Sequence, residues 1–212
     1  MGLEVEARFR SEGREPLERL AAETSLAHAS LGPPRTVREE DRYLDTHDGR
    51  LRAARWACRL RSRESKTRIS LKGPPDRPTA GWLHRRPEVE GPATESIEPD
   101  AWPASAARDL LLDLSRGEPL TEWLRLLQER TERAVTAGER VIGELSLDAL
   151  VAERDGERLG ELYVAELEIG EGEDPDRDLR ALADALAARP GLSPEPLTKL
   201  ELALAFAAPG AS

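Results

Sequence analysis

The sequence predicts an α+β domain built on an antiparallel sheet, and two observations lead to this expectation. Segments in which apolar and charged residues alternate with a period of two recur along the chain between turn signals, which is typical of strands. Segments with apolar residues at helical spacing lie between and after them. Because 212 residues suffice for one domain with a substantial core, we expect residues 1–212 to form a single domain.

The N-terminal half is expected to be rich in strands. Residues 3–10 alternate so strictly that one strand face is apolar and the other is entirely charged. Apolar residues at helical spacing then predict a helix over residues 15–28. The further expected elements are an extended run ending at residues 43–45, a turn at 46–49, a helical turn at 51–55, a hairpin of 57–63 with 67–72, and a short strand over 85–90.

The second half begins with a change of pattern. Residues 104–127 carry apolar residues at helical spacing, interrupted by Gly117 and Pro119, and predict a helical insertion. An antiparallel meander and two helices are expected to follow: strands over 130–135, 141–151 and 159–169 with turns at 137–138 and 155–156, a helix that begins at Asp174-Pro175 and ends at Pro190-Gly191, and a last helix over 196–206.

Charge and cysteine content exclude several classes of function. The chain has 31 Lys and Arg against 41 Asp and Glu, a formal net charge of −10, which argues against a general nucleic-acid binder. Its one cysteine, Cys58, allows neither an internal disulfide nor a Cys-rich zinc site, and it fits a reducing, cytoplasmic setting. No apolar run is long enough to span a bilayer, so we expect no membrane partner.

Short clusters of one charge sign recur on the predicted strands. They are Glu4 with Glu6, Arg59 with Arg61, Lys72, Glu88 with Glu90, Asp148, and Glu166 with Glu168. On a single strand such a face is most simply explained by solvation. If the faces converged inside a closed barrel, acidic and basic walls would confront one another, and a polyanion together with a divalent metal would complement both.

These motifs resemble, in order, those of the CYTH superfamily, also called triphosphate tunnel metalloenzymes. Glu4-Val-Glu6-Ala-Arg8 resembles the opening Glu-x-Glu-x-Lys signature of that family. The resemblance continues along nearly the whole chain with Asp41-Arg-Tyr-Leu-Asp-Thr46, Gly49-Arg-Leu51, Arg59-Leu-Arg61, Ile69-Ser-Leu-Lys72-Gly73-Pro74, Glu88-Val-Glu90, Arg130-Thr-Glu-Arg133, Leu147-Asp148, Glu166-Leu-Glu168 and Thr198-Lys199.

The resemblance implies a closed eight-stranded antiparallel β-barrel, or tunnel, with a charged lumen and helices packed outside. Members hydrolyse inorganic tripolyphosphate, thiamine triphosphate or nucleoside triphosphates, or cyclise ATP as class IV adenylyl cyclases do. The implied cofactor is Mg²⁺ or Mn²⁺ and the implied partner is a small triphosphate. Whether the protein is a monomer or a homodimer stays open.

Site residues are carried over by position in the motifs. The resemblance implies that the metal ligands and their acidic partners are Glu4, Glu6, Glu88, Glu90, Asp148, Glu166 and Glu168. It implies that the phosphate ligands are Arg8, Arg59, Arg61, Lys72, Arg130, Arg133 and Lys199. The catalytic group is expected to be Glu4, Glu6, Arg8 and Lys72.

Two positions depart from the family pattern. Arg8 stands where the family usually has Lys. The arginine keeps the positive charge, but unlike lysine it cannot act as a proton donor of tunable pKa. Arg130 and Arg133 have odd separation, so they cannot share a face of a regular strand, and we expect Arg130 to point inward. Elsewhere, Cys58 is expected to pack on the outer side of the barrel and the three histidines to lie on the surface.

Three hypotheses for function remain. The first is metal-dependent hydrolysis of inorganic tripolyphosphate or a small organic triphosphate, with release of orthophosphate. The second is cyclisation of ATP to cyclic AMP, for which no residue here can be assigned to hold adenine and ribose. The third is a non-catalytic module that binds polyphosphate or a triphosphate, which would need the cationic residues but not a properly occupied metal site.

Overall fold

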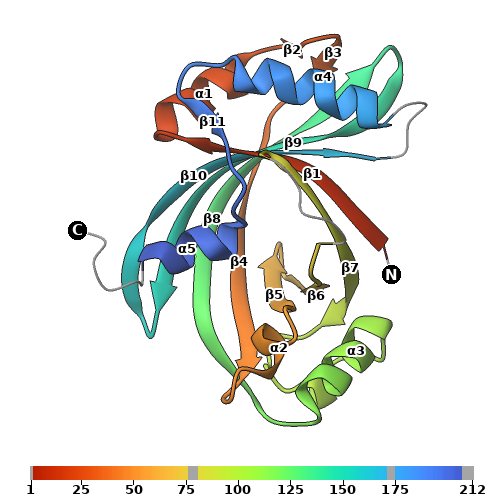
Figure 1. The fold of residues 1–212 in the computed structure, drawn as a ribbon, viewed down its shortest axis with the longest axis vertical. Coiled ribbons are helices and arrows are strands. Elements are labelled where there is room, and N and C mark those ends of the chain that lie inside the picture. The colour runs from red at the N-terminus through yellow and green to blue at the C-terminus, as the bar shows by residue number, and fades with distance from the viewer. Residues whose placement is uncertain (1, 76–80, 171–174, 207–212) are drawn as a thin grey trace.

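Eight long antiparallel strands close into a barrel in the structure, a computed structural model that describes residues 2–75, 81–170 and 175–206. The strand order is β8-β4-β5-β6-β7-β1-β10-β9, and the pairing of β9 with β8 closes the ring. The strands are β1 (Gly2–Ser11), β4 (Arg35–Thr46), β5 (Ala57–Arg63), β6 (Lys66–Lys72), β7 (Leu83–Ala93), β8 (Leu120–Ala137), β9 (Arg140–Arg154) and β10 (Glu157–Ile169). The expected eight-stranded tunnel is confirmed (Figure 1).

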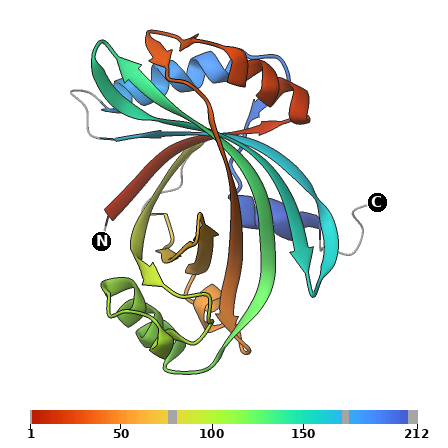
Figure 2. The ribbon, with the colours of Figure 1, turned by 180° about the vertical axis from the view of Figure 1, so that it is seen from behind.

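Short elements gather at the two ends of the barrel (Figures 1 and 2). At one end lie helices α1 (Arg14–Ala22) and α4 (Pro175–Ala187) with strands β2 (Ser25–Leu26) and β3 (Ala29–Leu31). At the other end lie α2 (Arg50–Ala53), the 3-10 helix η1 (Pro99–Ala101) and α3 (Ala106–Ser115). Strand β11 (Leu192–Pro194) pairs with the end of β1 and leads towards α5 (Lys199–Phe206).

Three apolar clusters hold these elements to the barrel. In the first, Leu17 of α1 and Leu182 of α4 pack on the outer faces of β1, β9 and β10. In the second, Leu111 of α3 packs on the outer faces of β5 and β6, where Cys58 is buried as expected. The third places Leu202 of α5 against the cavity-facing side of β8, β9 and β10. None of the described helices is long and apolar enough to cross a membrane.

The predicted hairpins are confirmed, and their turns explain why. The β5–β6 turn has Glu64 at φ 48° and Ser65 at φ 63°, and the β9–β10 turn has Asp155 at φ 52° and Gly156 at φ 80°. Two successive left-handed residues form the type I′ turn, whose twist matches that of antiparallel strands. The local sequence therefore sets the register of these strands.

Two helix predictions were wrong in extent. The helix expected over 15–28 ends at Ala22, because the chain turns at Ala27, with φ 49°, and forms the small β2–β3 hairpin. The helical insertion expected over 104–127 is helical only over Ala106–Ser115. Left-handed residues at positions 116 and 117 end that helix, and the following leucines belong to β8, which is 18 residues long. Asp174, the expected first residue of the next helix, lies outside the described residues.

Candidate active site

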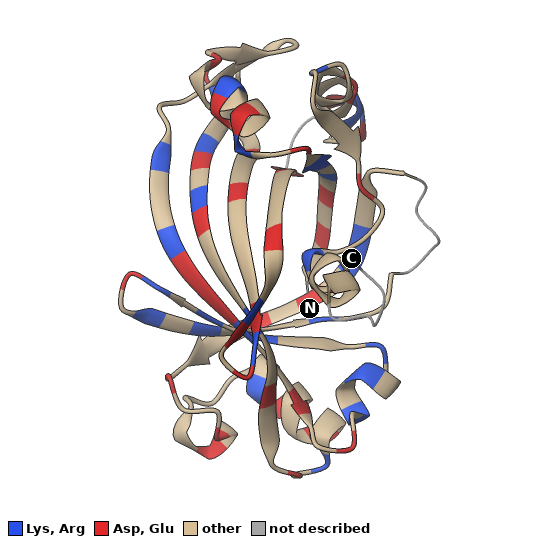
Figure 3. Ribbon diagram, turned by 90° about the vertical axis from the view of Figure 1, so that its left-hand side faces the viewer, with Lys and Arg blue, Asp and Glu red and all other residues tan. Residues whose placement is uncertain are grey.

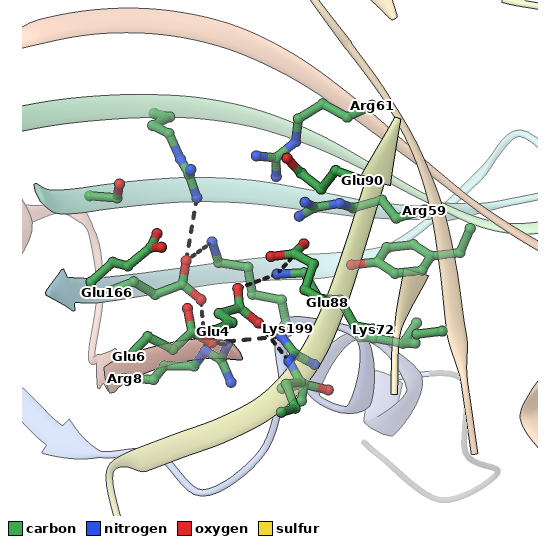
Figure 4. Close-up of a pocket in the computed structure, with 18 residues that line it drawn as sticks. Glu4, Glu6, Arg8, Arg59, Arg61, Lys72, Glu88, Glu90, Glu166 and Lys199 are labelled. Atoms are coloured by element: carbon green, nitrogen blue, oxygen red, sulfur yellow. Dashed lines mark hydrogen bonds and ion pairs between the residues drawn. The ribbon is translucent and has the colours of Figure 1, made fainter. Parts of the chain in front are cut away.

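A cavity of about 220 Å³ lies inside the barrel and is lined by charged side chains from its strands and from α5. Six of the lining side chains are carboxylates and seven are cations. The carboxylates are Glu4, Glu6, Glu88, Glu90, Glu166 and Glu168, and the cations are Arg8, Arg59, Arg61, Lys72, Arg86, Arg130 and Lys199. Figure 3 shows both charge signs along the strands, and Figure 4 shows the side chains converging.

The alternation of β1 and its pairing partners build one wall of this cavity. Glu4, Glu6 and Arg8 lie at alternate positions and therefore point to the same side of the strand. In the register with β7, Glu4 lies opposite Arg86. In the register with β10, Glu6 lies opposite Glu168 and Arg8 lies opposite Glu166.

The pair of Glu6 and Glu168 makes one region of the cavity acidic. Like charges directly opposite across a strand pair are destabilising, and Glu168 is also paired with Glu144 of β9. Desolvation, with the nearby carboxylates of Glu4 and Glu6, raises the pKa of Glu168 to about 7. No ion pair to Glu168 is found within residues 2–75, 81–170 and 175–206.

This acidic region fits a hard divalent cation by its chemistry. Carboxylate oxygens are the ligands that Mg²⁺ and Mn²⁺ prefer, and a cation between Glu6 and Glu168 would relieve their repulsion. In the described part of the chain, no three such ligands already converge as a finished metal site. Glu6 is at present bound by Arg8, so a metal would have to share this carboxylate with the guanidinium.

Glu4 is held by two cations from neighbouring strands. Its Oε1 accepts from Lys72 Nζ, and its Oε2 accepts from Arg86 Nε at 2.8 Å. Burial opposes ionisation of Glu4, but Lys72 and Arg86 outweigh it and lower its pKa to about 2. Burial and the charge of Arg59 in turn lower the pKa of Lys72. Glu88 completes this group at 3.4 Å from Lys72 Nζ.

Arginines dominate another region of the cavity. In Figure 4, Arg59 and Arg61 lie on one side of the cluster, and Glu6 and Arg8 lie on the other. Asp41 of β4 accepts from Arg61 Nε at 2.6 Å and Nη2 at 2.7 Å. Arg59 is less well satisfied, since its Nη1 lies 3.5 Å from Asp41 and its buried Nε has no hydrogen-bond partner among the described residues. An anion with several oxygens would supply that partner.

A capping box fixes the start of α5. Thr198 Oγ1 accepts from Glu201 N at 3.1 Å, and Glu201 Oε2 accepts from Thr198 N at 2.7 Å. Lys199, the first helical residue, is thereby directed to the cavity, where its Nζ donates to Asp148 at 2.6 Å and to Glu166. Burial opposes the charge of Glu166, yet Lys199 and its other cationic neighbours hold its pKa well below the usual range.

Two predicted site residues do not line the cavity. Asp148 is fully buried on the lumenal side of β9, beneath the two cations that it binds: it accepts from Arg130 at 2.8 and 3.0 Å and from Lys199. It therefore holds these two cations, and we leave it out of the metal ligands.

Arg133 is the second, and it points away from the lumen, as expected from its odd separation from Arg130. Its guanidinium donates to the backbone carbonyls of Gly32 at 2.6 Å, Ala21 at 2.8 Å and Leu31 at 2.9 Å, and to that of Glu23. Because its donors are used in joining α1 and β3 to β8, we leave Arg133 out of the phosphate ligands.

Sequence reasoning missed several residues of the site. Arg86 lines the cavity and has the same parity as Glu88 and Glu90, so its position within the predicted strand could have revealed it. Asp41 lies in a quoted motif but received no role, because its ion pairs with β5 depend on strand pairing. The expectation of three surface histidines was wrong for His84, which is 7% exposed.

Comparisons with known proteins give the same fold. The CYTH domain model matches residues 2–201, whereas no curated protein matches the chain. HpAC1 from Hippeastrum, described as having a dominant triphosphatase activity, shares 19% identity and a TM-score of 0.69 over 95% of both chains. A Bacillus halodurans protein, named as a candidate adenylate cyclase, shares 21% identity and a TM-score of 0.61 over 95% of this chain and 98% of its own.

A third solved structure is also similar. The PH1819 protein from Pyrococcus horikoshii OT3 shares 18% identity and a TM-score of 0.56 over 94% of this chain and 98% of its own. At these identities the three structures support the fold alone. The match of the family model to residues 2–201, on a barrel whose lumen carries the family's charged motifs, shows that this chain belongs to the CYTH family.

Proposed function

We propose that the protein hydrolyses a triphosphate inside its barrel with the help of a divalent cation and releases orthophosphate. The observation that carries the proposal is the cavity inside the barrel, to which six strands and α5 bring both acidic and basic side chains. Seven cations exceed six carboxylates by only one charge. A bound polyanion therefore needs further positive charge for neutrality, which divalent cations would supply.

The size of the cavity favours inorganic triphosphate as the substrate. At about 220 Å³ it is smaller than typical sites for drug-sized ligands, which are roughly 300–1,000 Å³. Thirteen of the eighteen residues that line it are charged, and Tyr43 is the one aromatic side chain among them. A small triphosphate ion matches both properties, whereas the organic part of a larger triphosphate would have to lie outside.

The carboxylates proposed to hold the cation are Glu4, Glu6, Glu166 and Glu168, with Glu88 and Glu90 nearby. A divalent cation held there supplies positive charge against the phosphate oxygens as negative charge develops during phosphoryl transfer. Mg²⁺ and Mn²⁺ both suit oxygen ligands of this kind.

The cations of the cavity are proposed to bind and orient the phosphates. Arg59 offers an unpartnered Nε, and Lys72 and Arg86 reach the cavity from adjacent strands. Asp41 fixes the plane of the Arg61 guanidinium through two hydrogen bonds. This side chain is therefore already oriented before a phosphate binds. The barrel wall limits water around the terminal phosphorus, which strengthens each of these charge interactions.

A phosphate-release panel tests the proposal. Inorganic tripolyphosphate, thiamine triphosphate, ATP and pyrophosphate are each assayed with Mg²⁺, Mn²⁺ or a chelator, and cyclic AMP is measured with ATP. We expect metal-dependent release of orthophosphate from tripolyphosphate. Formation of cyclic AMP instead would indicate a cyclase, and tight binding of tripolyphosphate without turnover would indicate a binding module.

Two variants make this test specific. Glu6→Gln and Glu168→Gln keep the side-chain shape but remove the opposed charges across β1 and β10. We expect each to reduce metal-dependent turnover by about 10²-fold or more, the order found when one group that stabilises transition-state charge is removed. Glu157→Gln, on an exposed position of the same strand as Glu168, is the control. Unchanged turnover in the first two variants would refute the metal assignment.

A further inference from the structure

The side chain of Arg8, where this chain departs from the family's lysine, is enclosed by partners from several elements. Its Nε donates to Glu166 of β10 at 2.7 Å, and its Nη2 donates to Glu6 of β1. Its Nη1 donates to the carbonyl oxygen of Leu197 at 3.0 Å and lies 3.3 Å from both ring nitrogens of His84 of β7. The side chain is only 2% exposed.

His84 extends these contacts to the chain before α5. Its Nε2 lies 2.9 Å from the carbonyl oxygen of Glu195, which can only accept, so Nε2 carries the hydrogen and Nδ1 accepts from Arg8. Burial and the charge of Arg8 lower the pKa of His84 to about 4, which keeps the ring neutral as this arrangement requires. In addition, Glu195 N donates to the backbone oxygen of Arg8 at 3.0 Å.

Residues 195–197, which we call the strap, are thus held to β1 and β7 by Arg8 and His84. The strap leads directly into the capping box of α5, and the first residue of that helix is Lys199. The position of the strap therefore decides where the Lys199 ammonium lies relative to Asp148 and Glu166.

Arg8 differs from Arg59 in how many of its hydrogen-bond donors already have a partner. A guanidinium has five N–H groups, and Arg8 uses four of them, in hydrogen bonds to Glu6, His84, Glu166 and the carbonyl oxygen of Leu197 in the strap. Arg59, by contrast, has its Nε without a partner in the described ranges. A phosphate could take at most the one remaining N–H of Arg8 without breaking a contact already made, whereas it would give the buried Nε of Arg59 a partner.

We propose that Arg8 is a positioning residue that fixes the strap and thereby sets Lys199 for a triphosphate in the cavity. The sequence-based expectation that Arg8 itself binds phosphate is revised accordingly. A lysine could not replace it, because one ammonium nitrogen cannot reach Glu6, Glu166 and the strap together. The inference rests on the proposed function only in its kinetic test.

Hydrogen exchange tests the structural part in the full chain without substrate. Arg8→Lys keeps the charge but loses the hydrogen bonds to the strap and His84, so we expect the amides of residues 197–206 to exchange about tenfold faster or more. Arg10→Lys, the same exchange at an exposed position of β1, is the control and should leave them unchanged. If Arg8→Lys does not fold, His84→Ala, which removes one link to the strap, is measured in the same way.

Kinetics with inorganic triphosphate and Mg²⁺ tests the link to Lys199. If Arg8 acts through Lys199, Arg8→Lys and Lys199→Met should each raise KM by about tenfold. The KM of the double variant should then not exceed the higher of the two single-variant KM values. If Arg8 binds phosphate itself, the two effects should multiply.

Unchanged exchange at residues 197–206 in Arg8→Lys, or multiplying effects on KM, would overturn the proposal. Absence of triphosphate hydrolysis in the wild-type protein would instead overturn the proposed function. The exchange experiment would still decide the role of Arg8 in that case, because it needs neither substrate nor metal.

Discussion

Replacing Asp41 by asparagine should destabilise the protein strongly, because it removes one charge from a buried ion network. Asp41 is 0% exposed and accepts two hydrogen bonds from Arg61, while Arg59 Nη1 lies 3.5 Å away. Burial opposes its ionisation, but Arg61 and Arg59 hold the pKa of the Asp41 carboxyl well below its usual range. Asparagine has the same shape but keeps only one acceptor, so the change removes the charge and also places an NH₂ donor against one of the two Arg61 N–H groups.

The expected cost follows from the partners left behind. Removing one member of a buried ion pair costs about 3–5 kcal/mol, and Glu39, 3.2 Å from Arg61, partly compensates here, so we expect a loss near the lower limit, about 3 kcal/mol. For a chain of this size each kcal/mol shifts the melting temperature by roughly 2–4 °C, which gives a decrease of about 6–12 °C.

Thermal unfolding with and without inorganic triphosphate measures both the cost and its origin. Because Asp41→Asn leaves Arg59 and Arg61 with excess charge, triphosphate should stabilise this variant more than the wild-type protein. Asp184→Asn, at an exposed position of α4, is the control and should change stability by about 0.5 kcal/mol or less. A decrease in melting temperature of less than about 2 °C for Asp41→Asn would show that the Arg61 guanidinium does not need the Asp41 charge for its burial, and would refute this reasoning.

The remaining predictions concern Glu168 and Arg133. The pKa of Glu168, about 7, lies above its ordinary 4.5, so the folded state binds this proton more tightly than the unfolded chain. Stability without metal should therefore fall as pH rises from 4.5 through 7. Glu168→Gln should flatten this profile, and Mg²⁺ should restore stability at pH 8 in the wild type only. Turnover should rise over the same pH range, because protons compete with the metal, and a rate maximum near pH 5 would contradict this. Arg133→Ala should lower the free energy of unfolding by about 2 kcal/mol or more, since several carbonyls lose a charged donor, yet leave KM for triphosphate unchanged. Denaturant unfolding and steady-state kinetics check this, and a raised KM would return Arg133 to the phosphate site.

The local pattern of the chain determined the strands and many of their lumenal faces. A period of two in residues 3–10 places Glu4, Glu6 and Arg8 on one side wherever the strand lies. The β9–β10 turn at Asp155-Gly156 sets its hairpin through left-handed residues, which is also a local property. The local pattern gave the wrong prediction over residues 120–127, because the spacing of the leucines there suits both a helix and a strand. This segment is a strand because it pairs with β4 and β9.

Contacts between segments far apart in sequence decided what each charge does. Arg133 and Arg130 differ only in parity along β8, yet one is bound by backbone carbonyls and the other by Asp148. Asp148 looks like its acidic neighbours in the sequence, and its burial behind Lys199 of α5 is what removes it from the cavity. The sequence by itself determined which side chains share a strand face. Barrel closure decided which opposite charges meet, because ion pairing depends on distances of a few ångströms across strands that are distant in the chain.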